Sequence, residues 1–218
     1  MGDLSGMKYQ LLMNDSKSFK HPISKRTVKL FRIYCLSDFE TFDGKKVLSS
    51  QLGGYIESES NLNQDDKSWL FNNAEIFDDA LLIDSTLYDT VKVFGSGILQ
   101  NSIIKSRVRI WTSGLVKNSQ VFDNVDIFDS TNVNNCIIKN SCKVHGYSSV
   151  EGSILLDGSR VSGNAKVFDS TLKDVSEVSG VSEIRNCHFS GRTYVNNAVL
   201  INETREDNIE LKIVTNNE

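Results

Sequence analysis

The chain has 218 residues, which is enough for one large domain or two small ones. Its formal net charge of −4 excludes a generally basic protein of the kind that binds double-stranded DNA. It contains one proline, where average usage predicts about ten. A backbone held almost everywhere in a hydrogen-bond ladder excludes proline in this way, because proline has no N–H to donate.

The cysteines and the start of the chain bear on where the protein works. The four cysteines show no C-x-x-C spacing. The first residues lack the apolar core of a signal peptide, and no apolar run approaches the length that crosses a membrane. We therefore expect a cytoplasmic protein with reduced thiols and no membrane partner.

Residues 1–68 are expected to form a β-rich N-terminal cap. Lys8–Met13 and Thr27–Leu36 both have the composition of strands, and the second is rich in β-branched and aromatic residues. Gly53 and Gly54 then allow a tight turn, after which Tyr55 and Ile56 can pack under the next part of the chain.

From Leu70 onward, aliphatic residues or phenylalanine recur every 17 positions in three columns that are offset by 6, 6 and 5 residues. At this chain's hydrophobic content such agreement does not arise by chance. The columns are Leu70, Leu87, Ile104, Val121, Ile138, Leu155, Leu172 and Phe189; Ile76, Val93, Ile110, Ile127, Val144, Val161, Val178 and Val195; and Leu82, Leu99, Val116, Val133, Val150, Val167, Ile184 and Ile201.

Small residues form further columns in the same register, and residues that favour turns precede them. One small column consists of Ser85, Ser102, Ser119, Cys136, Ser153, Ser170 and Cys187. Just before it come Asp84, Asn101, Asn118, Asn135, Gly152, Asp169 and Asn186. Glycine, asparagine and aspartate bend a chain at low steric cost, so these positions predict the corners of a repeating coil.

The periodicity predicts an all-β solenoid over residues 69–202, with about eight 17-residue coils of three short strands each. A large aliphatic residue points inward from every strand, and successive coils stack about 4.8 Å apart. No coil can bury its own aliphatic residues, so the stack itself is the core. Residues 203–218 follow as a C-terminal strand and tail, in which Ile209, Leu211 and Ile213 alternate with charged residues.

Strands with an aliphatic residue and a small residue at six-residue spacing resemble the hexapeptide-repeat family of left-handed parallel β-helices. The resemblance covers about Trp69 to Asn202. It implies a left-handed, triangular β-helix, and it implies a homo-oligomer because proteins of this fold are commonly trimers. A right-handed solenoid is the alternative, although its coils are usually longer.

The N-terminal part carries a second resemblance. The stretch Gly53-Gly54-Tyr55-Ile56-Glu57-Ser58-Glu59-Ser60-Asn61-Leu62, with Leu30-Phe31-Arg32-Ile33 before it and Trp69 after it, resembles a bacterial and phage-borne group of β-helix proteins. Members of that group are often labelled transferases from their fold alone. The resemblance implies a phage or prophage origin.

A column of rings is predicted on one outward face. Phe77, Phe94, Trp111, Phe128 and His145 follow the second inward column in five consecutive coils. Lys92, Arg109 and Lys143 lie in the column beside it. Three interpretations compete: a ladder that stiffens the sheet, a subunit or partner interface, and a surface for a nucleotide, single-stranded nucleic acid or sugar.

Enzymatic activity has weak support in the sequence. Acyltransferases of the hexapeptide family typically use a histidine base and a loop thrown out of the coil. Only His145 is placed to be such a base, and the register runs from Leu70 to Ile201 without an insertion. A zinc site built from three histidines is not expected, because His145 and His188 are about two and a half coils apart.

We therefore expect a non-catalytic binding protein, homo-oligomeric, phage-derived and acting on a host component. The expected binding residues are the five rings with Lys92, Arg109 and Lys143. The expected partner is a host protein or a nucleotide or sugar ligand, and no metal or cofactor is expected. The alternative function is acyl transfer with His145 as the catalytic base.

Overall fold

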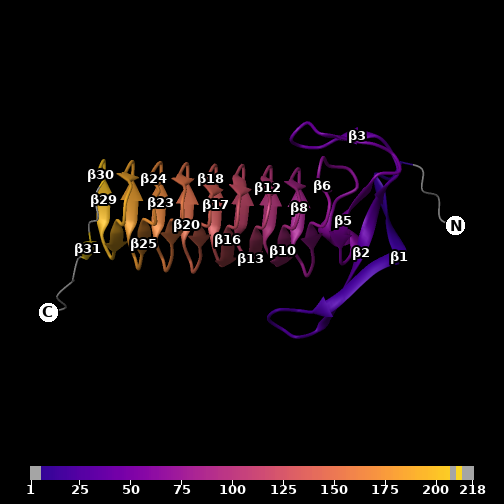
Figure 1. The fold of residues 1–218 in the computed structure, drawn as a ribbon, viewed down its shortest axis with the longest axis horizontal. Helices are drawn as coiled ribbons and strands as arrows, with labels where there is room; N and C mark the ends of the chain where they lie inside the picture. The colour runs from indigo at the N-terminus through magenta and orange to yellow at the C-terminus, as the bar shows by residue number, and fades with distance from the viewer. Residues whose placement is uncertain (1–5, 207–209, 213–218) are drawn as a thin grey trace.

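A computed structural model describes residues 6–206 and 210–212 of the chain. Figure 1 shows a rod of stacked coils, with the N-terminal strands at one end and the C-terminal strand at the other. One short 3-10 helix, Glu59–Asn61, is the only helix in the described part of the chain. The all-β parallel solenoid predicted from the 17-residue period is confirmed, and the rod has about nine turns.

Three sheets run along the rod, and each takes one strand from every coil. Sheet 1 contains β1 (Tyr9–Lys20), β2 (Thr27–Cys35), β5 (Leu52–Ile56), β7 (Glu75–Ile76), β10 (Lys92–Gly95), β13 (Arg109–Thr112), β16 (Asp126–Asp129), β19 (Lys143–Val144), β22 (Arg160–Val161), β25 (Glu177–Ser179), β28 (Tyr194–Asn196) and β31 (Glu210–Lys212).

Sheet 2 contains β8 (Leu81–Ile83), β11 (Ile98–Gln100), β14 (Leu115–Lys117), β17 (Asn132–Asn134), β20 (Ser149–Glu151), β23 (Lys166–Phe168), β26 (Glu183–Arg185) and β29 (Val199–Ile201). Sheet 3 contains β6 (Trp69–Leu70), β9 (Thr86–Leu87), β12 (Ile103–Lys105), β15 (Gln120–Phe122), β18 (Ile137–Lys139), β21 (Ile154–Leu155), β24 (Thr171–Leu172), β27 (His188–Phe189) and β30 (Thr204–Arg205). A separate small hairpin joins β3 (Phe39–Glu40) to β4 (Lys46–Val47).

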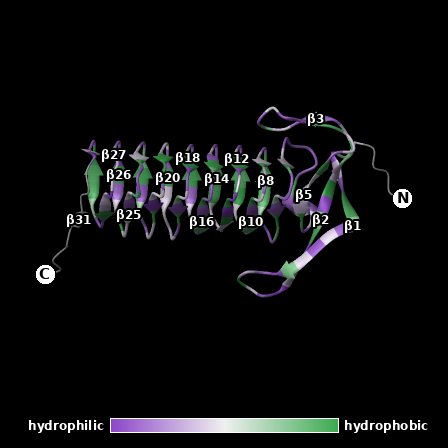
Figure 2. Ribbon diagram, in the orientation of Figure 1, coloured by the Kyte–Doolittle hydropathy of each residue, from purple (hydrophilic) through white to green (hydrophobic). Residues whose placement is uncertain are grey.

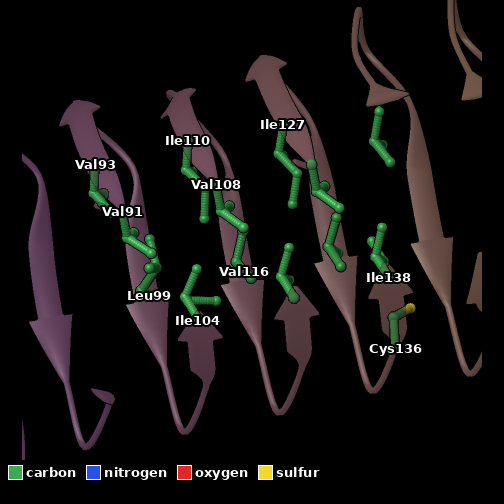
Figure 3. Close-up of a cluster of buried hydrophobic side chains, with 14 of the residues drawn as sticks. Val91, Val93, Leu99, Ile104, Val108, Ile110, Val116, Ile127, Cys136 and Ile138 are labelled. Atoms are coloured by element: carbon green, nitrogen blue, oxygen red, sulfur yellow. The ribbon is translucent and has the colours of Figure 1, made fainter. Parts of the chain in front are cut away.

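The inward columns form one continuous core along the rod. Val93 pairs with Ile110, and Ile110 with Ile127, so side chains one period apart in the sequence lie on neighbouring strands. Figure 3 shows these residues pointing into the interior together with Leu99, Ile104 and their neighbours. The core residues of the central coils are fully buried, which explains why the period holds so strictly there.

The corners use the turn residues that the sequence marks. Asp84, Asn101, Asn118, Asn135 and Asn186 have positive φ, between 44° and 54°. This left-handed backbone region is open at low cost only to glycine, asparagine and aspartate, which explains their column. In Figure 2 the tips of many turns are hydrophilic, whereas the strands between them carry the hydrophobic residues.

The last coil differs from the prediction. Ile184 pairs with Leu200 and not with Ile201, because the final coil is one residue shorter than the others. Ile201 is 55% exposed, whereas Leu200 packs against the core. The inward position therefore belongs to Leu200.

The first coil begins earlier than the repeat arithmetic indicates. Ile56 on β5 pairs in parallel with Ile76, and Leu62 forms a parallel bridge with Leu82. Both of these steps are longer than the repeat, so a search at the fixed period does not detect them. The division of the chain after residue 68, the left hand of the helix and its triangular section stay predictions.

The N-terminal strands complete sheet 1 and leave it to form a long hairpin. β2 pairs antiparallel with β5, and β1 pairs antiparallel with β2. β1 extends to Lys20, beyond the expected end at Met13, after an irregularity between Leu12 and Ser16. In Figure 1 the tip of this hairpin and the β3–β4 hairpin reach along two sides of the rod. The predicted C-terminal strand corresponds to β31, while Ile209 and Ile213 lie outside the described residues.

Candidate binding site

Sheet 1 carries the five outward rings as a continuous stack. Ring centroids are 4.8 Å apart for Phe77 and Phe94, 5.9 Å for Phe94 and Trp111, and 4.6 Å for each of the next two pairs. All neighbouring ring planes lie within 10° of parallel. We call this stack the ring ladder. Because its rings cover one another's faces, mainly their edges point outward.

The β1–β2 hairpin covers the N-terminal half of the ring ladder. Phe77 is 1% exposed and Phe94 6%, which corrects the expectation that both rings stand open on the surface. The rings of Phe19 and His21 meet Phe77 edge-on at 5.4 and 5.6 Å, and His21 meets Phe94 in the same way. Apolar rings on both surfaces explain why the hairpin lies down here.

A polar cluster fastens the tip of the hairpin to the rod. Nδ1 of His21 accepts two backbone N–H groups, so we assign the ring proton to Nε2, which donates to Asp78 at 2.9 Å. Arg26 forms a two-pronged ion pair with Glu57, at 2.6 and 2.9 Å, and also binds Asp78. We call His21, Arg26, Glu57 and Asp78 the hairpin latch.

The latch shifts the pKa of both its carboxyl groups. The hydrogen bonds from Arg26 are the largest influence on Glu57, and they lower its pKa. For Asp78, burial is the largest single influence and acts to raise the pKa, but hydrogen bonds from Arg26, His21 and the Gly95 N–H together outweigh it and lower the pKa. Both groups are therefore held as carboxylates.

The Gly-Gly-Tyr-Ile-Glu stretch contributes both to the packing under the hairpin and to the latch. Gly53 and Gly54 lie within strand β5 and not in a tight turn as expected. A Cβ on Gly53 would collide with Ile33 and one on Gly54 with Ala74, so both glycines are required by close packing. The same stretch supplies Glu57 of the latch. A single sequence carries no signal for this role, because the partners of Glu57 are brought near it only by folding.

Hollows lie on both flanks of the hairpin tip, and Trp111 lines two of them. The larger hollow, of about 580 Å³, is lined by residues that include His21, Ile23, Trp111, Asp129 and Tyr147. The other hollow, of about 470 Å³, is the more apolar of the two, and we call it the hairpin groove. The hairpin groove is lined by Phe19, Lys20, Pro22, Ile23, Phe77, Lys92, Phe94, Arg109 and Trp111.

The cations of this face are only partly neutralised. Lys92 pairs with Glu75 at 3.0 Å, and Arg109 makes a two-pronged pair with Asp126 at 2.8 Å, which raises the pKa of Arg109. A further hollow beside the groove contains Arg107 together with both these cations. The hairpin adds positive charge, since residues 16–32 contain six lysines or arginines and no carboxylate.

His145, the alternative catalytic residue, lies at the C-terminal end of the ladder. Its ring stacks on Phe128 with an interplanar angle of 0°. Within the described residues the ring has no hydrogen-bond partner to fix its tautomer, whereas a catalytic histidine is usually oriented by one. The same part of the chain has no group of three metal-ligating side chains.

The β3–β4 hairpin lies on the other side of the rod and acts as a clamp. Asp43 accepts hydrogen bonds from Thr86 at 3.0 Å and from Tyr88 at 2.6 Å. Lys45 lies over the stacked rings of Phe71 and Tyr88. These contacts are satisfied internally, so we regard this hairpin as structural.

Comparison with known proteins adds one match. A family model described as "GlmU-like, C-terminal hexapeptide" matches residues 78–150. No curated protein matches the chain. No helix in the described part of the chain is long and apolar enough to cross a membrane.

The matched residues coincide with coils in which the 17-residue register and the three parallel sheets continue without interruption. Match and architecture together fit the hexapeptide-repeat β-helix superfamily.

Proposed function

We propose that the protein is a non-catalytic interaction protein whose partner binds in the hairpin groove, with Trp111 as the anchor. The observation that carries the proposal is the position of Trp111, which is half-buried and lines the hollows on both flanks of the hairpin tip. Half-buried aromatic residues in a concave apolar site are the usual anchors of protein interfaces.

The charge around the groove indicates what kind of partner would fit. Lys20 and Arg109 line the groove itself, and Arg107 lies in the hollow next to it. Phe19, Phe94 and Trp111 supply aromatic surface to the groove. A protein segment that carries an apolar side chain flanked by acidic residues would satisfy both features.

Acyl transfer is the second candidate, since the superfamily includes acyltransferases. His145 is the residue that would serve as the base. The absence of an orienting partner for its ring in the described part of the chain makes this candidate the weaker one.

We also propose a homo-oligomer, because hexapeptide-repeat proteins often form trimers. Phage origin and a host target rest on the N-terminal resemblance alone and stay predictions. Light scattering on the purified protein gives the oligomeric mass, and a monomer at micromolar concentration would contradict this part of the proposal.

The interaction is tested by affinity capture with two substitutions of the same residue. Trp111→Ser removes the anchor and should lower recovery of the partner by at least about tenfold, whereas Trp111→Phe keeps a ring and should retain most of it. Phe122→Ser removes a half-buried ring from sheet 3 and is the matched control. Equal recovery with wild type and Trp111→Ser, in protein with an unchanged melting temperature, would refute the proposal.

A further inference from the structure

The ring ladder ends at His145 with one ring face uncovered. His145 stacks on Phe128 at 4.6 Å, and it is half-buried. Its backbone pairs with the coil that contains Ser162, which is the next outward residue in the column. A serine side chain is too small to cover an imidazole, so the stack stops there although the sheet continues.

The other end of the ring ladder is closed. Phe77 is covered by Phe19 and His21, and the preceding outward position is Glu57, which is held by Arg26. The ladder is therefore asymmetric, and its C-terminal end is the one that offers a ring face to a planar molecule.

The surroundings leave room for one ring. On the following rung the outward residue is again a serine, Ser179, whose hydroxyl bonds to Tyr194 and Asn196 on the strand beyond it. The adjoining turn is flat because Gly146 and Gly163 stack so closely that a Cβ on Gly146 would lie 2.6 Å from the carbonyl oxygen of Gly163. Rings in this ladder repeat at 4.6–5.9 Å, so a planar group over Ser162 would continue the stack.

Two exposed cations flank the open position. Lys143 and Arg160 pair in register on neighbouring strands, and each lies two residues before His145 or Ser162 on the same outward face. Neither forms an ion pair within the described part of the chain. The nearest carboxylates in the column are Asp126, which Arg109 occupies, and Glu177 on the rung beyond Arg160.

We propose that His145, Ser162, Lys143 and Arg160 form a binding site for a planar aromatic ring that carries an anionic group, of which a mononucleotide is the simplest example. The base becomes the sixth ring of the ladder, and the phosphate lies against the two cations. This site is two coils away from the hairpin groove, and either proposal can fail without the other.

The probe is adenosine monophosphate, with adenosine and inorganic phosphate as separate arms. Binding is measured by titration calorimetry in every variant, and also through the NMR signals of the His145 ring in proteins that keep it. We expect adenosine monophosphate to bind more tightly than either part alone. His145→Ala should weaken it by about tenfold, because one base stack is lost. Lys143→Gln with Arg160→Gln should weaken adenosine monophosphate but leave adenosine unchanged.

Ser162→Phe is the sharpest variant, because it places a ring of the protein's own in the open position. It should abolish the nucleotide-induced shifts of the His145 ring signals while leaving the melting temperature equal or higher, and Ser162→Thr is the matched control that should still show these shifts. Unchanged shifts of His145 in Ser162→Phe would overturn the proposal. So would equal affinity for inorganic phosphate and adenosine monophosphate, which would indicate an adventitious anion site, or no binding at millimolar concentration.

Discussion

At the scale of single residues, the small column that begins at Ser85, at the corner between sheets 2 and 3, links successive coils by hydrogen bonds. In each case the serine hydroxyl accepts the backbone N–H of the matching residue in the next coil and donates to the carbonyl two residues before it, as Ser119 does with Cys136 and Lys117. Cys136 keeps the donor half of this pattern through its Sγ contact to the carbonyl of Asn134. Cys187 keeps both halves, since its Sγ contacts the carbonyl of Arg185 and accepts the N–H of Glu203. The sequence predicted small residues here from their size, but not the bonds between coils.

Ser119→Ala therefore removes more than one contact. The N–H of Cys136 and the carbonyl of Lys117 lose a partner in a buried place, and we expect the free energy of unfolding to fall by about 1–3 kcal/mol. Urea denaturation measures the change. Ser113→Ala is the control, because that hydroxyl is exposed and shares an exposed hydrogen bond with Ser130 in the neighbouring coil. Similar losses for both substitutions would mean that burial of the corner is not what matters.

At the scale of elements, only part of the β1–β2 hairpin could be predicted from the sequence. The apolar residues of Thr27–Leu36 predicted β2 correctly to within one residue. The second half of β1 was not predicted, because the polar residues after Met13 show no alternation of apolar and polar side chains. This half of the strand is held by its pairing with β2 and by contacts with the ring ladder. Because this part of the hairpin was not predicted, neither the latch nor the burial of Phe77 and Phe94 was predicted.

The hairpin should open in acid before the rod unfolds. Folding lowers the pKa values of Glu57 and Asp78 below their ordinary values of 4.5 and 3.8. A carboxyl group with a lowered pKa stabilises the fold above its ordinary pKa, and this stability is lost as the pH falls through the lowered value. We therefore expect the hydrogen-exchange protection factors of residues 9–35 to fall below about pH 4.5, while those of residues 103–172 are still high.

Substitutions in the latch separate this effect from general acid unfolding. Arg26→Gln removes the charge that holds both carboxylates, and it should open the hairpin already at neutral pH. Lys25→Gln is the matched control, since within the described residues the side chain of Lys25 bonds only to the carbonyl of Pro22 in the same turn. If the hairpin and the coils lost protection together in both variants, the hairpin would not be a separate unit.

At the scale of the whole molecule, the rod is a one-dimensional stack in which each coil contacts mainly its neighbours. The 17-residue period predicted this architecture because it arises from contacts between successive coils, which the sequence records directly. Both ends were predicted less well, because the step between coils lengthens at Ile56 and shortens at Leu200. The surface was least predictable, since the hairpin that covers it comes from outside the repeat.

The period also determines which deletions the rod can accept. Ser149 and Val150 pair with Lys166 and Val167 in the next coil, so removing residues 150–166 joins Ser149 to Val167 in the same register. Every later inward residue stays inward, and we expect a cooperative fold with a modestly lower melting temperature. Removing residues 150–165 instead places Lys166 at the inward position of Val150 and reverses the faces of the strand.

This second deletion is one residue shorter and otherwise matched, so the two proteins differ in register rather than in size. We expect it to lose cooperative melting by circular dichroism, and to lose hydrogen-exchange protection after residue 149, because a charged side chain cannot be buried unpaired in the dry core. Equal melting of the two deletions would mean that the corners absorb a one-residue slip in the middle of the rod. The final coil makes that outcome a real alternative, since it loses one residue between Asn196 and Val199 and keeps its strands paired. The last coil has no long run of coils after it to keep in register, and this difference is why we expect the middle of the rod to be less tolerant.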